Sequence, residues 1–234
     1  VEIPMDSSYG VPFLFLQPTS LIVNSNGIRV CNEGICENSA ITCNVIDRQK
    51  GRCAFAVLST TGIKHFKKDG MDYSNGVAQG DLTADLDEHM EELEKLYPGS
   101  LAIADSVGEL ADKLGINKEN LLDTVEEYND ICEEKYDDVF GKNRKYLHAV
   151  HGKKYYAAKM VCGAYGSLGG IVVNNHFEVL DEEEQPIKGL YAAGTDTCDL
   201  YAGTYLYYLP GNTMGYAINS GRIAGENAAE FAEE

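Results

Sequence analysis

The sequence predicts an α+β fold, in which short strands are interspersed with amphipathic helices. Three observations support this prediction. Short apolar runs such as residues 21–23 and 53–58 have the length of strands. Residues 118–136 place apolar side chains at the spacing of a helix. The carboxyl third changes to short strands and then an alanine-rich segment, which predicts a long helix over residues 212–231.

The amino-terminal part is expected to contribute strands. Residues 13–16 and 21–23 are apolar runs on either side of a break marked by Pro18, and both are predicted as strands. A tight turn is expected at residues 24–27, because Asn-Gly tolerates positive φ. Residues 28–30 would then return as the second strand of a hairpin.

Four helices are predicted in the middle of the chain. Ser106 and Glu109 form an S-x-x-E capping box that opens a helix through Leu114, and Gly115 ends it. Asn117 is expected to cap the helix that follows. The four predicted helices span residues 39–48, 85–96, 106–114 and 118–136.

The carboxyl third is expected to hold short strands before the closing helix. Residues 170–173 and 178–180 should form a hairpin around Asn174 and Asn175. Residues 189–194 read as a further strand that ends at a glycine.

The composition disfavours nucleic acid, membranes and metal ions as binding partners. With 37 acidic and 19 basic side chains the formal net charge is −18, which disfavours nucleic acid or an anionic membrane. No apolar run reaches the roughly 18 residues of a membrane span. The seven cysteines form no C-x-x-C pair, so reduced thiols and no metal site are expected.

Two features of the carboxyl third suggest a ligand site. Asp196 follows the strand that ends at Gly194, a position where α/β proteins bind ligands, and its carboxylate suits a sugar-alcohol chain. The helix that starts at Asn212 presents free N–H groups and partial positive charge, which would favour the negative edge of a reduced isoalloxazine ring. The alternatives are an ordinary turn and an ordinary Asn-capped helix start. A glycine-rich G-x-G-x-x-G turn, which cradles a dinucleotide pyrophosphate, is absent from the sequence.

Taken together, residues 169–229 resemble the carboxyl end of the fumarate reductase and succinate dehydrogenase flavoprotein superfamily, which includes 3-ketosteroid dehydrogenases and urocanate-type reductases. The resemblance rests on Gly-Leu-Tyr-Ala-Ala-Gly at 189–194, Gly-Asn at 211–212 and Gly-Arg-Ile-Ala-Gly-Glu-Asn-Ala-Ala at 221–229. Upstream stretches similar to the family's capping domain are residues 21–34, 110–116, 124–129, 140–142 and 155–159.

The resemblance implies a domain plan. Residues 1–20 would finish the first half of a flavin domain, residues 21–158 would form a capping domain, and residues 159–234 would be the carboxyl part of the FAD-binding domain. The amino-terminal half of that domain, which holds the ADP portion of FAD, would be absent. The chain would then be a fragment of a flavoprotein, with an incomplete α/β FAD-binding domain and weak or no FAD binding of its own.

The resemblance also implies which residues contact the cofactor. Asp196 stands where the family more often has Glu, which keeps the carboxylate but shortens its reach. The expected flavin contacts are Gly169, Gly170, Gly194, Asp196, Gly211, Asn212, Thr213 and Met214.

The expected substrate differs from fumarate. Family reductases pass hydride from flavin N5 to an activated C=C bond, and they hold substrate carboxylates with a His and an Arg. Tyr165 and Tyr208 stand at those two places in this sequence. A neutral phenol binds a carboxylate less well than a bidentate Arg, so the two tyrosines would instead orient a carbonyl or stack on an aromatic acid. The alternative is that they only pack.

The resemblance also bears on the proton route. The family delivers the proton from a cap arginine, and Lys64 is the nearest cation at the matching stretch, residues 59–65. A surface lysine is the alternative interpretation. Glu33 would serve a proton relay, although Glu37 stands where the relay arginine is expected.

The resulting functional expectation is an FAD-dependent oxidoreductase fragment that acts on a small unsaturated carbonyl or carboxylate compound and reduces its C=C bond. One alternative is a 3-ketosteroid-type dehydrogenase. The other is an isolated cap module with neither cofactor nor activity.

Overall fold

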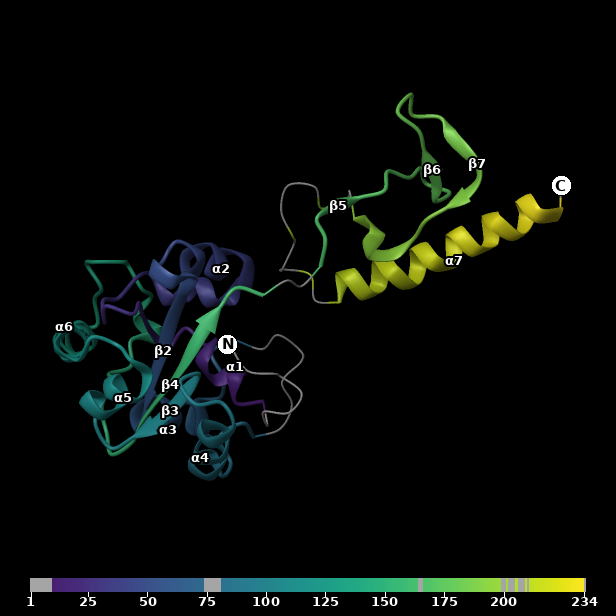
Figure 1. Ribbon diagram of the computed structural model, residues 1–234. Helices are drawn as coiled ribbons and strands as arrows, with labels where there is room; N and C mark the ends of the chain where they lie inside the picture. Colours follow the sequence, from purple (N-terminus) through teal and green to yellow (C-terminus); the bar gives the residue numbers. More distant parts are fainter. Residues whose placement is uncertain are drawn as a thin grey trace. The chain divides into compact units, whose positions relative to one another are not determined.

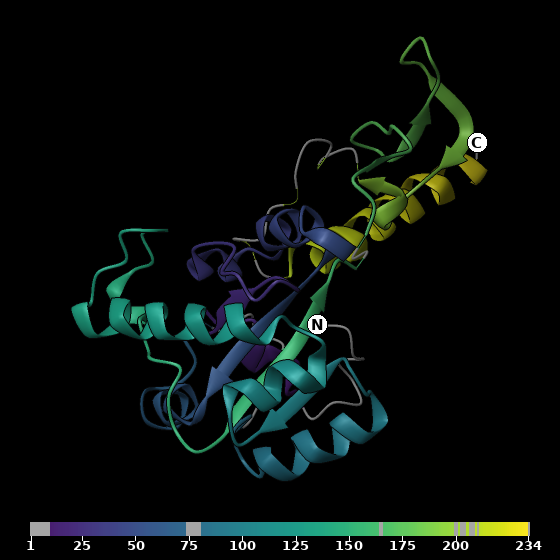
Figure 2. The same cartoon turned by 60° about the vertical axis from the view of Figure 1, so that its left-hand side comes forward.

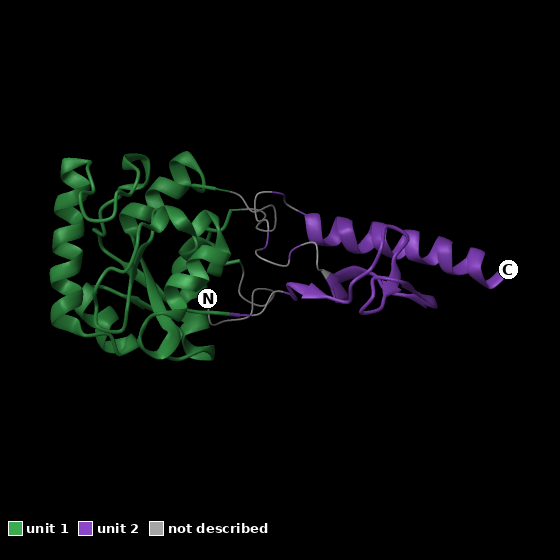
Figure 3. Ribbon diagram, turned by 90° about the horizontal axis from the view of Figure 1, so that it is seen from above, with its two compact units in different colours: residues 1–162 green, residues 163–234 purple. Residues whose placement is uncertain are grey.

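The computed structural model describes residues 10–73, 81–163, 166–198, 201, 205, 209 and 211–233. The chain divides into two compact units, residues 1–162 and residues 163–234 (Figures 1 and 3).

Unit 1 is built on a four-stranded antiparallel sheet with the order β1-β2-β4-β3. Its strands are β1 (Leu21–Val23), β2 (Cys53–Ser59), β3 (Leu101–Ala104) and β4 (Tyr155–Val161). The long strands β2 and β4 run side by side through the unit (Figure 2), with Ala56 opposite Ala158. The helices are α1 (Pro12–Phe15), η1 (Glu33–Glu37), α2 (Ser39–Asp47), η2 (Lys50–Arg52), α3 (Thr60–Asp69), α4 (Leu86–Leu96), α5 (Val107–Leu114), α6 (Lys118–Glu134) and η3 (Arg144–Tyr146).

Both faces of this sheet are buried, and the alternation along β2 shows how. Ala56 and Leu58 belong to a core that also contains side chains of α1, α2, α3 and α4. Phe55 and Val57 point the other way, into a second core shared with α5 and α6. Successive side chains of a strand point to opposite faces, so one strand supplies two cores.

The predicted strand at residues 13–16 is wrong, because this stretch forms the short helix α1. Pro12 occupies the first turn, where its fixed φ suits a helix and its missing N–H costs nothing. All four residues of α1 are buried. A short continuous apolar run does not distinguish a buried strand from a buried helix, and here tertiary packing decides.

The predicted turn at residues 24–27 is confirmed. Gly27 has φ +78° and its N–H donates to the Asn24 carbonyl at 2.9 Å. The return segment 28–30 forms a single bridge, between Val23 and Arg29, rather than a full strand. The partner of β1 along its whole length is β2.

The predicted helices form with the expected caps. Ser106 Oγ accepts from the Glu109 N–H at 3.1 Å, and the Glu109 carboxylate accepts from the N–H of Asp105 rather than that of Ser106. The side chain of Asn117 caps α6 by accepting from the Asn120 N–H at 3.0 Å.

In its described residues, unit 2 contains two small antiparallel sheets and one long helix. Its elements are β5 (Gly169–Gly170), β6 (Glu178–Leu180), β7 (Pro186–Tyr191), η4 (Gly194–Asp196), β8 (Thr197–Cys198) and α7 (Asn212–Glu233). β5 pairs with β8, and β6 pairs with β7. The predicted hairpin around Asn174 is present as a bridge between Val173 and Val179, but the strand partner of β6 is β7.

The division at residue 162 separates the two units, and side chains of α1 lie in a core of unit 1. The assignment of residues 1–20, 21–158 and 159–234 to flavin domain, cap and flavin domain stays a prediction. Over the ranges described above, no helix combines the length and apolar character that crossing a bilayer requires.

Candidate functional site

The first part of the candidate site is the turn after β7. Gly194 has φ +73°, a backbone conformation that favours glycine, and it starts η4. The Gly194 N–H donates to Ser220 Oγ at 2.9 Å, and the Gly194 carbonyl accepts from Thr197 Oγ1 at 2.9 Å. The Asp196 carbonyl accepts from the Ile171 N–H at 2.7 Å. The turn is therefore held from both sides, while the Asp196 side chain is exposed.

The second part is the amino end of α7. The Tyr205 hydroxyl donates to Asn212 Oδ1 at 2.8 Å and also contacts Thr213 Oγ1. Thr213 Oγ1 donates to Asn212 Oδ1 at 3.2 Å. The side chain of Met214 is 67% exposed. Tyr205 thus fixes the first residues of the helix, a role that its sequence position did not reveal.

These residues fit the ring and ribityl end of a flavin. The Asp196 carboxylate can accept hydrogen bonds from hydroxyl groups, and the helix end offers N–H donors and partial positive charge. Around Gly169 and Gly211, which have φ +81° and +77°, an added Cβ would meet no atom of the described residues within 4 Å. The space beside these two glycines is thus open to a ligand. Gly170 follows in the same extended β5, with φ +142°.

Tyr165 and Tyr208, the two residues predicted to orient the substrate, lie outside the described residues. Their roles stay predictions.

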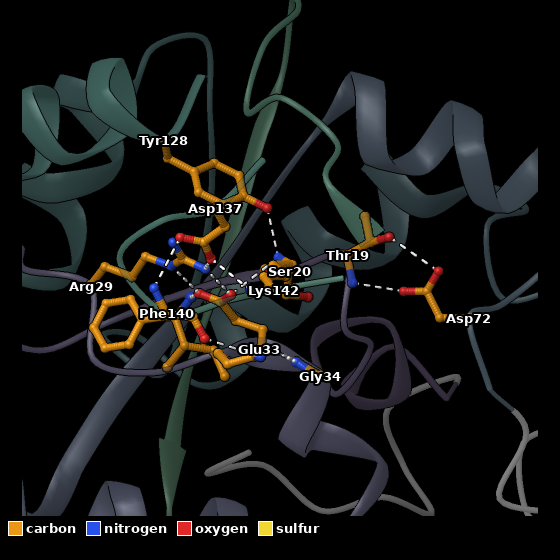
Figure 4. A network of polar contacts seen from close by, with 12 residues as sticks. Thr19, Ser20, Arg29, Glu33, Gly34, Asp72, Tyr128, Asp137, Phe140 and Lys142 are labelled. Atoms are coloured by element: carbon orange, nitrogen blue, oxygen red, sulfur yellow. Dashed lines mark hydrogen bonds and ion pairs between the residues drawn. The ribbon is translucent and has the colours of Figure 1, made fainter. Parts of the chain in front are cut away.

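Glu33 lies in unit 1 at the centre of a buried ionic network (Figure 4). Its side chain has no solvent exposure, and both carboxylate oxygens accept from Arg29, at 2.9 and 2.8 Å. Lys142 Nζ lies 3.2 Å from Glu33 Oε2, and the Ile22 N–H donates to Oε1 at 3.2 Å. Arg29 also donates to Asp137 Oδ2 at 2.8 Å.

Lys142 is equally enclosed. Its ammonium donates to Tyr128 Oη at 2.6 Å and to the Ser20 carbonyl at 3.2 Å. Together with Glu33 these partners occupy all three of its protons. The Arg29 guanidinium lies 5.0 Å from the ring centroids of both Tyr128 and Phe140.

The network shifts the pKa values of Asp137, Arg29 and Tyr128. Burial opposes ionisation of Asp137, but the Arg29 hydrogen bond and the N–H groups of Phe140 and Lys142 lower its pKa to about 2. Burial likewise opposes the charge on Arg29, yet hydrogen bonds to Glu33 and Asp137 raise its pKa. Burial raises the pKa of Tyr128, and the Glu33 charge adds to that effect. These shifts keep Asp137 and Arg29 ionised and Tyr128 neutral.

The contacts of Glu33 are therefore those of a structural ion pair. Its predicted part in a proton relay stays a prediction, and it has no exposed atom in this structure. The sequence pointed to Glu33 through its motif. Nothing local in the sequence indicated Asp137 and Lys142, its network partners more than 100 residues away.

Lys64 lies on α3, exposed, beside a pocket of about 840 Å³ in unit 1. Lys154 and Tyr156, which also line this pocket, are themselves engaged: Lys154 Nζ lies 2.9 Å from Asp105, and Tyr156 Oη donates to Asp87 at 2.7 Å. Among the residues that the structure describes, Lys64 forms no hydrogen bond or ion pair that would mark it as a proton donor, so that role stays a prediction.

His65, the next residue of α3, lies in a more ordered setting. Its two ring nitrogens are 3.1 Å from Asp69 and 3.0 Å from Asp72, and its ring stacks on His148 with centroids 3.9 Å apart. Each ring nitrogen of His65 therefore faces a carboxylate. Burial, and then the charge of His65, lower the pKa of His148.

A comparison with known families supports the expectation of a flavin cofactor. Residues 5–214 match the family model described as FAD binding domain. The chain belongs to this family. FAD is accordingly the cofactor of the family, and the resemblance noted in the sequence is confirmed.

Two proteins similar to this chain are reductases. The chain is 31% identical over 220 residues to the vinyl phenol reductase of Lactiplantibacillus plantarum, covering 93% of this chain and 44% of that protein. It is 26% identical over 223 residues to the urocanate reductase of Eggerthella lenta, covering 93% of this chain and 32% of that protein.

Among solved structures, the open conformation of a flavocytochrome c3 fumarate reductase matches with a TM-score of 0.67 and 25% identity, over 96% of this chain and 34% of that chain. The chain thus spans less than half the length of each of these relatives.

Proposed function

We propose that this FAD binding domain chain is the part of a longer oxidoreductase that encloses the substrate and holds the ring end of FAD, and that the whole enzyme reduces a C=C bond conjugated to a carbonyl or an aromatic ring. The observation that carries the proposal is the similarity to a vinyl phenol reductase along 93% of the chain. The likeness to a urocanate reductase supports the same reaction class.

FAD supplies hydride transfer when it is bound. Residues of unit 2 would hold it: Asp196 would accept from the ribityl hydroxyls, and the amides at Thr213 and Met214 would face the ring edge. Gly169, Gly170, Gly194 and Gly211 would let the backbone approach the cofactor. The exposure of Asp196 and the open space beside Gly169 and Gly211 support these assignments.

Tyr165 and Tyr208 would orient the substrate. Because a phenol offers one neutral donor where an arginine offers a bidentate cation, we propose an aryl-alkene, enoate or enone as substrate in preference to a dicarboxylate such as fumarate. Lys64 is the proposed source of the proton, and Glu33 the proposed relay, although the buried contacts of Glu33 favour a structural role.

The test uses the longer parent protein. Purified protein is reduced anaerobically, and reoxidation of its flavin absorbance is followed with vinylphenols, cinnamate-type enoates, urocanate, steroid enones and fumarate. We expect an aryl-alkene or enoate to accelerate reoxidation, and fumarate to have little effect. Fastest reoxidation by fumarate contradicts the substrate class, while preference for a steroid supports the ketosteroid-type alternative.

A matched measurement concerns the 234-residue chain alone. A visible flavin band after addition of FAD shows that the site in unit 2 suffices for binding. If the chain stays colourless while the parent protein is yellow, FAD binding requires the segment of the parent that holds the pyrophosphate.

A further inference from the structure

Ser220 occupies an unusual position in unit 2. Of the α7 residues that the structure describes, Ser220 and Ala224 are the buried ones, and Ser220 is 1% exposed. A buried hydroxyl needs partners, and this one has two. Its Oγ donates to the Ala217 carbonyl of the same helix at 3.2 Å and accepts from the Gly194 N–H at 2.9 Å.

Tyr216 binds the same turn from one helical turn earlier. Its hydroxyl donates to the Thr197 carbonyl at 3.0 Å. Thr197, itself 2% exposed, donates from Oγ1 to the Gly194 carbonyl at 2.9 Å. One face of α7 therefore holds both ends of the 194–197 turn.

These contacts between α7 and the 194–197 turn determine the position of Asp196. Asp196 lies within the turn, whereas the amino end of α7 lies at Asn212. Ser220 is eight positions along the helix, about 12 Å at 1.5 Å per residue. Because a helix is rigid over that length, the contacts of Ser220 and Tyr216 set where Asp196 lies relative to the helix start.

We propose that Ser220 and Tyr216 are positioning residues for FAD, which hold Asp196 and the amino end of α7 at the separation that the ribityl chain and the ring require. This inference rests on the proposed function, since it places the cofactor at those two features. The helix start would favour the negatively charged reduced ring, and that effect falls off within the first turn. A shifted turn would thus weaken FAD binding and lower the midpoint potential of the bound flavin.

The test uses the longer FAD-binding protein with Ser220→Ala, Ser220→Thr and Tyr216→Phe. Asn219→Ala is the matched control, because Asn219 is exposed on the same helix and donates to the Gly215 carbonyl one turn earlier, at 2.8 Å. FAD affinity is measured by titration of the apoprotein, the midpoint potential by equilibration with redox dyes, and folding by urea denaturation.

We expect Ser220→Ala to weaken FAD binding about tenfold, as about 1.4 kcal/mol implies for one lost buried hydrogen bond, and to make the potential more negative. Ser220→Thr keeps the hydroxyl and should stay closer to wild type in both quantities. Tyr216→Phe should act in the same direction with a smaller effect, and it provides the answer if Ser220→Ala does not fold. Asn219→Ala should change neither.

Affinity and potential at wild-type values in both Ser220→Ala and Tyr216→Phe overturn the inference, even if the free energy of unfolding falls. A wild-type parent protein that binds no FAD overturns the proposed function as well.

Discussion

Glu33 carries a negative charge in a place that water does not reach. Its side chain is fully buried, and it is compensated by two cations, Arg29 and Lys142, of which the first also binds Asp137. Such a network is tolerated only while every member is present, because removing one partner leaves an uncompensated buried charge. Glu33 and Arg29 of this motif therefore stabilise the fold of unit 1.

Replacement of Glu33 tests its structural role. Glu33→Gln should lower the free energy of unfolding by about 3 kcal/mol, because Arg29 and Lys142 lose their shared counter-charge in a buried site. The measurement is urea denaturation of the 234-residue chain. The control is Asp47→Asn, which breaks the exposed pair with Arg52, whose side chains are 76% and 45% exposed, and should cost less than about 1 kcal/mol. Equal losses in the two variants would contradict the structural role.

His148 provides a prediction about pH. Its pKa in the folded chain is lowered by burial and then by the charge of His65, while Asp72 acts in the opposite direction. The unfolded chain, with an ordinary pKa near about 6.5, binds the proton more readily, so the free energy of unfolding should fall as the pH drops below about 6.5. The contribution of Asp137, whose folded pKa is about 2, is lost only at much lower pH.

The measurement is urea denaturation at about pH 7.5 and about pH 5.5. His148→Gln should reduce the difference between the two conditions, because it removes the titrating ring. The control is His176→Gln in unit 2, whose ring is exposed and contacts Asn227 at 3.2 Å. An unchanged pH dependence in His148→Gln would show that another group is responsible.

At the scale of elements, the turn after β1 is docked on the start of α6. The Asn117 N–H donates to the Ser25 carbonyl at 3.1 Å, and Asn120 Nδ2 donates to the Asn26 carbonyl at 2.8 Å. A Cβ on Gly27 would lie 2.6 Å from Leu121 N and 2.7 Å from Asn117 O. The glycine is thus required both by its positive φ and by the close approach of the helix.

Two glycine substitutions separate these requirements. Gly27→Ala should lower the free energy of unfolding by about 3 kcal/mol, since it combines left-handed strain with a clash against backbone. Gly115→Ala is the control, because Gly115 has φ +67° but open space around its Cβ position, so about 1 kcal/mol is expected. Thermal and urea unfolding measure both. A similar loss in the two variants would show that docking on α6 adds nothing.

At the scale of the whole molecule, the two units differ in how well they bury their apolar residues. Unit 1 has a core on each face of its sheet. In unit 2, large apolar side chains are exposed, among them Ile171 at 44%, Leu190 at 46% and Ile218 at 66%. Apolar exposure on this scale is typical of a surface that another part of a protein covers.

The two units should therefore behave differently when they are produced separately. Residues 10–162 should unfold cooperatively in urea, whereas residues 163–234 should bind the dye 8-anilinonaphthalene-1-sulfonate. Leu190→Lys with Ile218→Lys should reduce dye binding by the 163–234 fragment, and the exposed polar substitution Glu182→Lys is the control. Cooperative unfolding of that fragment without dye binding would contradict the prediction.

The sequence predicted correctly those features that depend on neighbouring residues, namely helix caps and a tight turn. The capping residues Ser106 and Asn117 placed the starts of α5 and α6, and Asn-Gly placed the turn at Gly27, because caps and turns depend on side chains within a few residues. The motifs from Gly169 onward were specific enough to indicate the family. The strand predicted at 13–16 failed, because packing rather than periodicity made it helical.

The sequence by itself determined the α+β class, most of the helices and the flavoprotein family of this chain. Tertiary structure alone decided which distant side chains meet. Glu33 pairs with Lys142, and Ser220 accepts a hydrogen bond from Gly194. The residues of each pair are far apart in the sequence, and no local pattern predicts that they meet. The physical reason is that burial demands a partner for every charge and hydroxyl, but only the folded chain determines which partner is within reach.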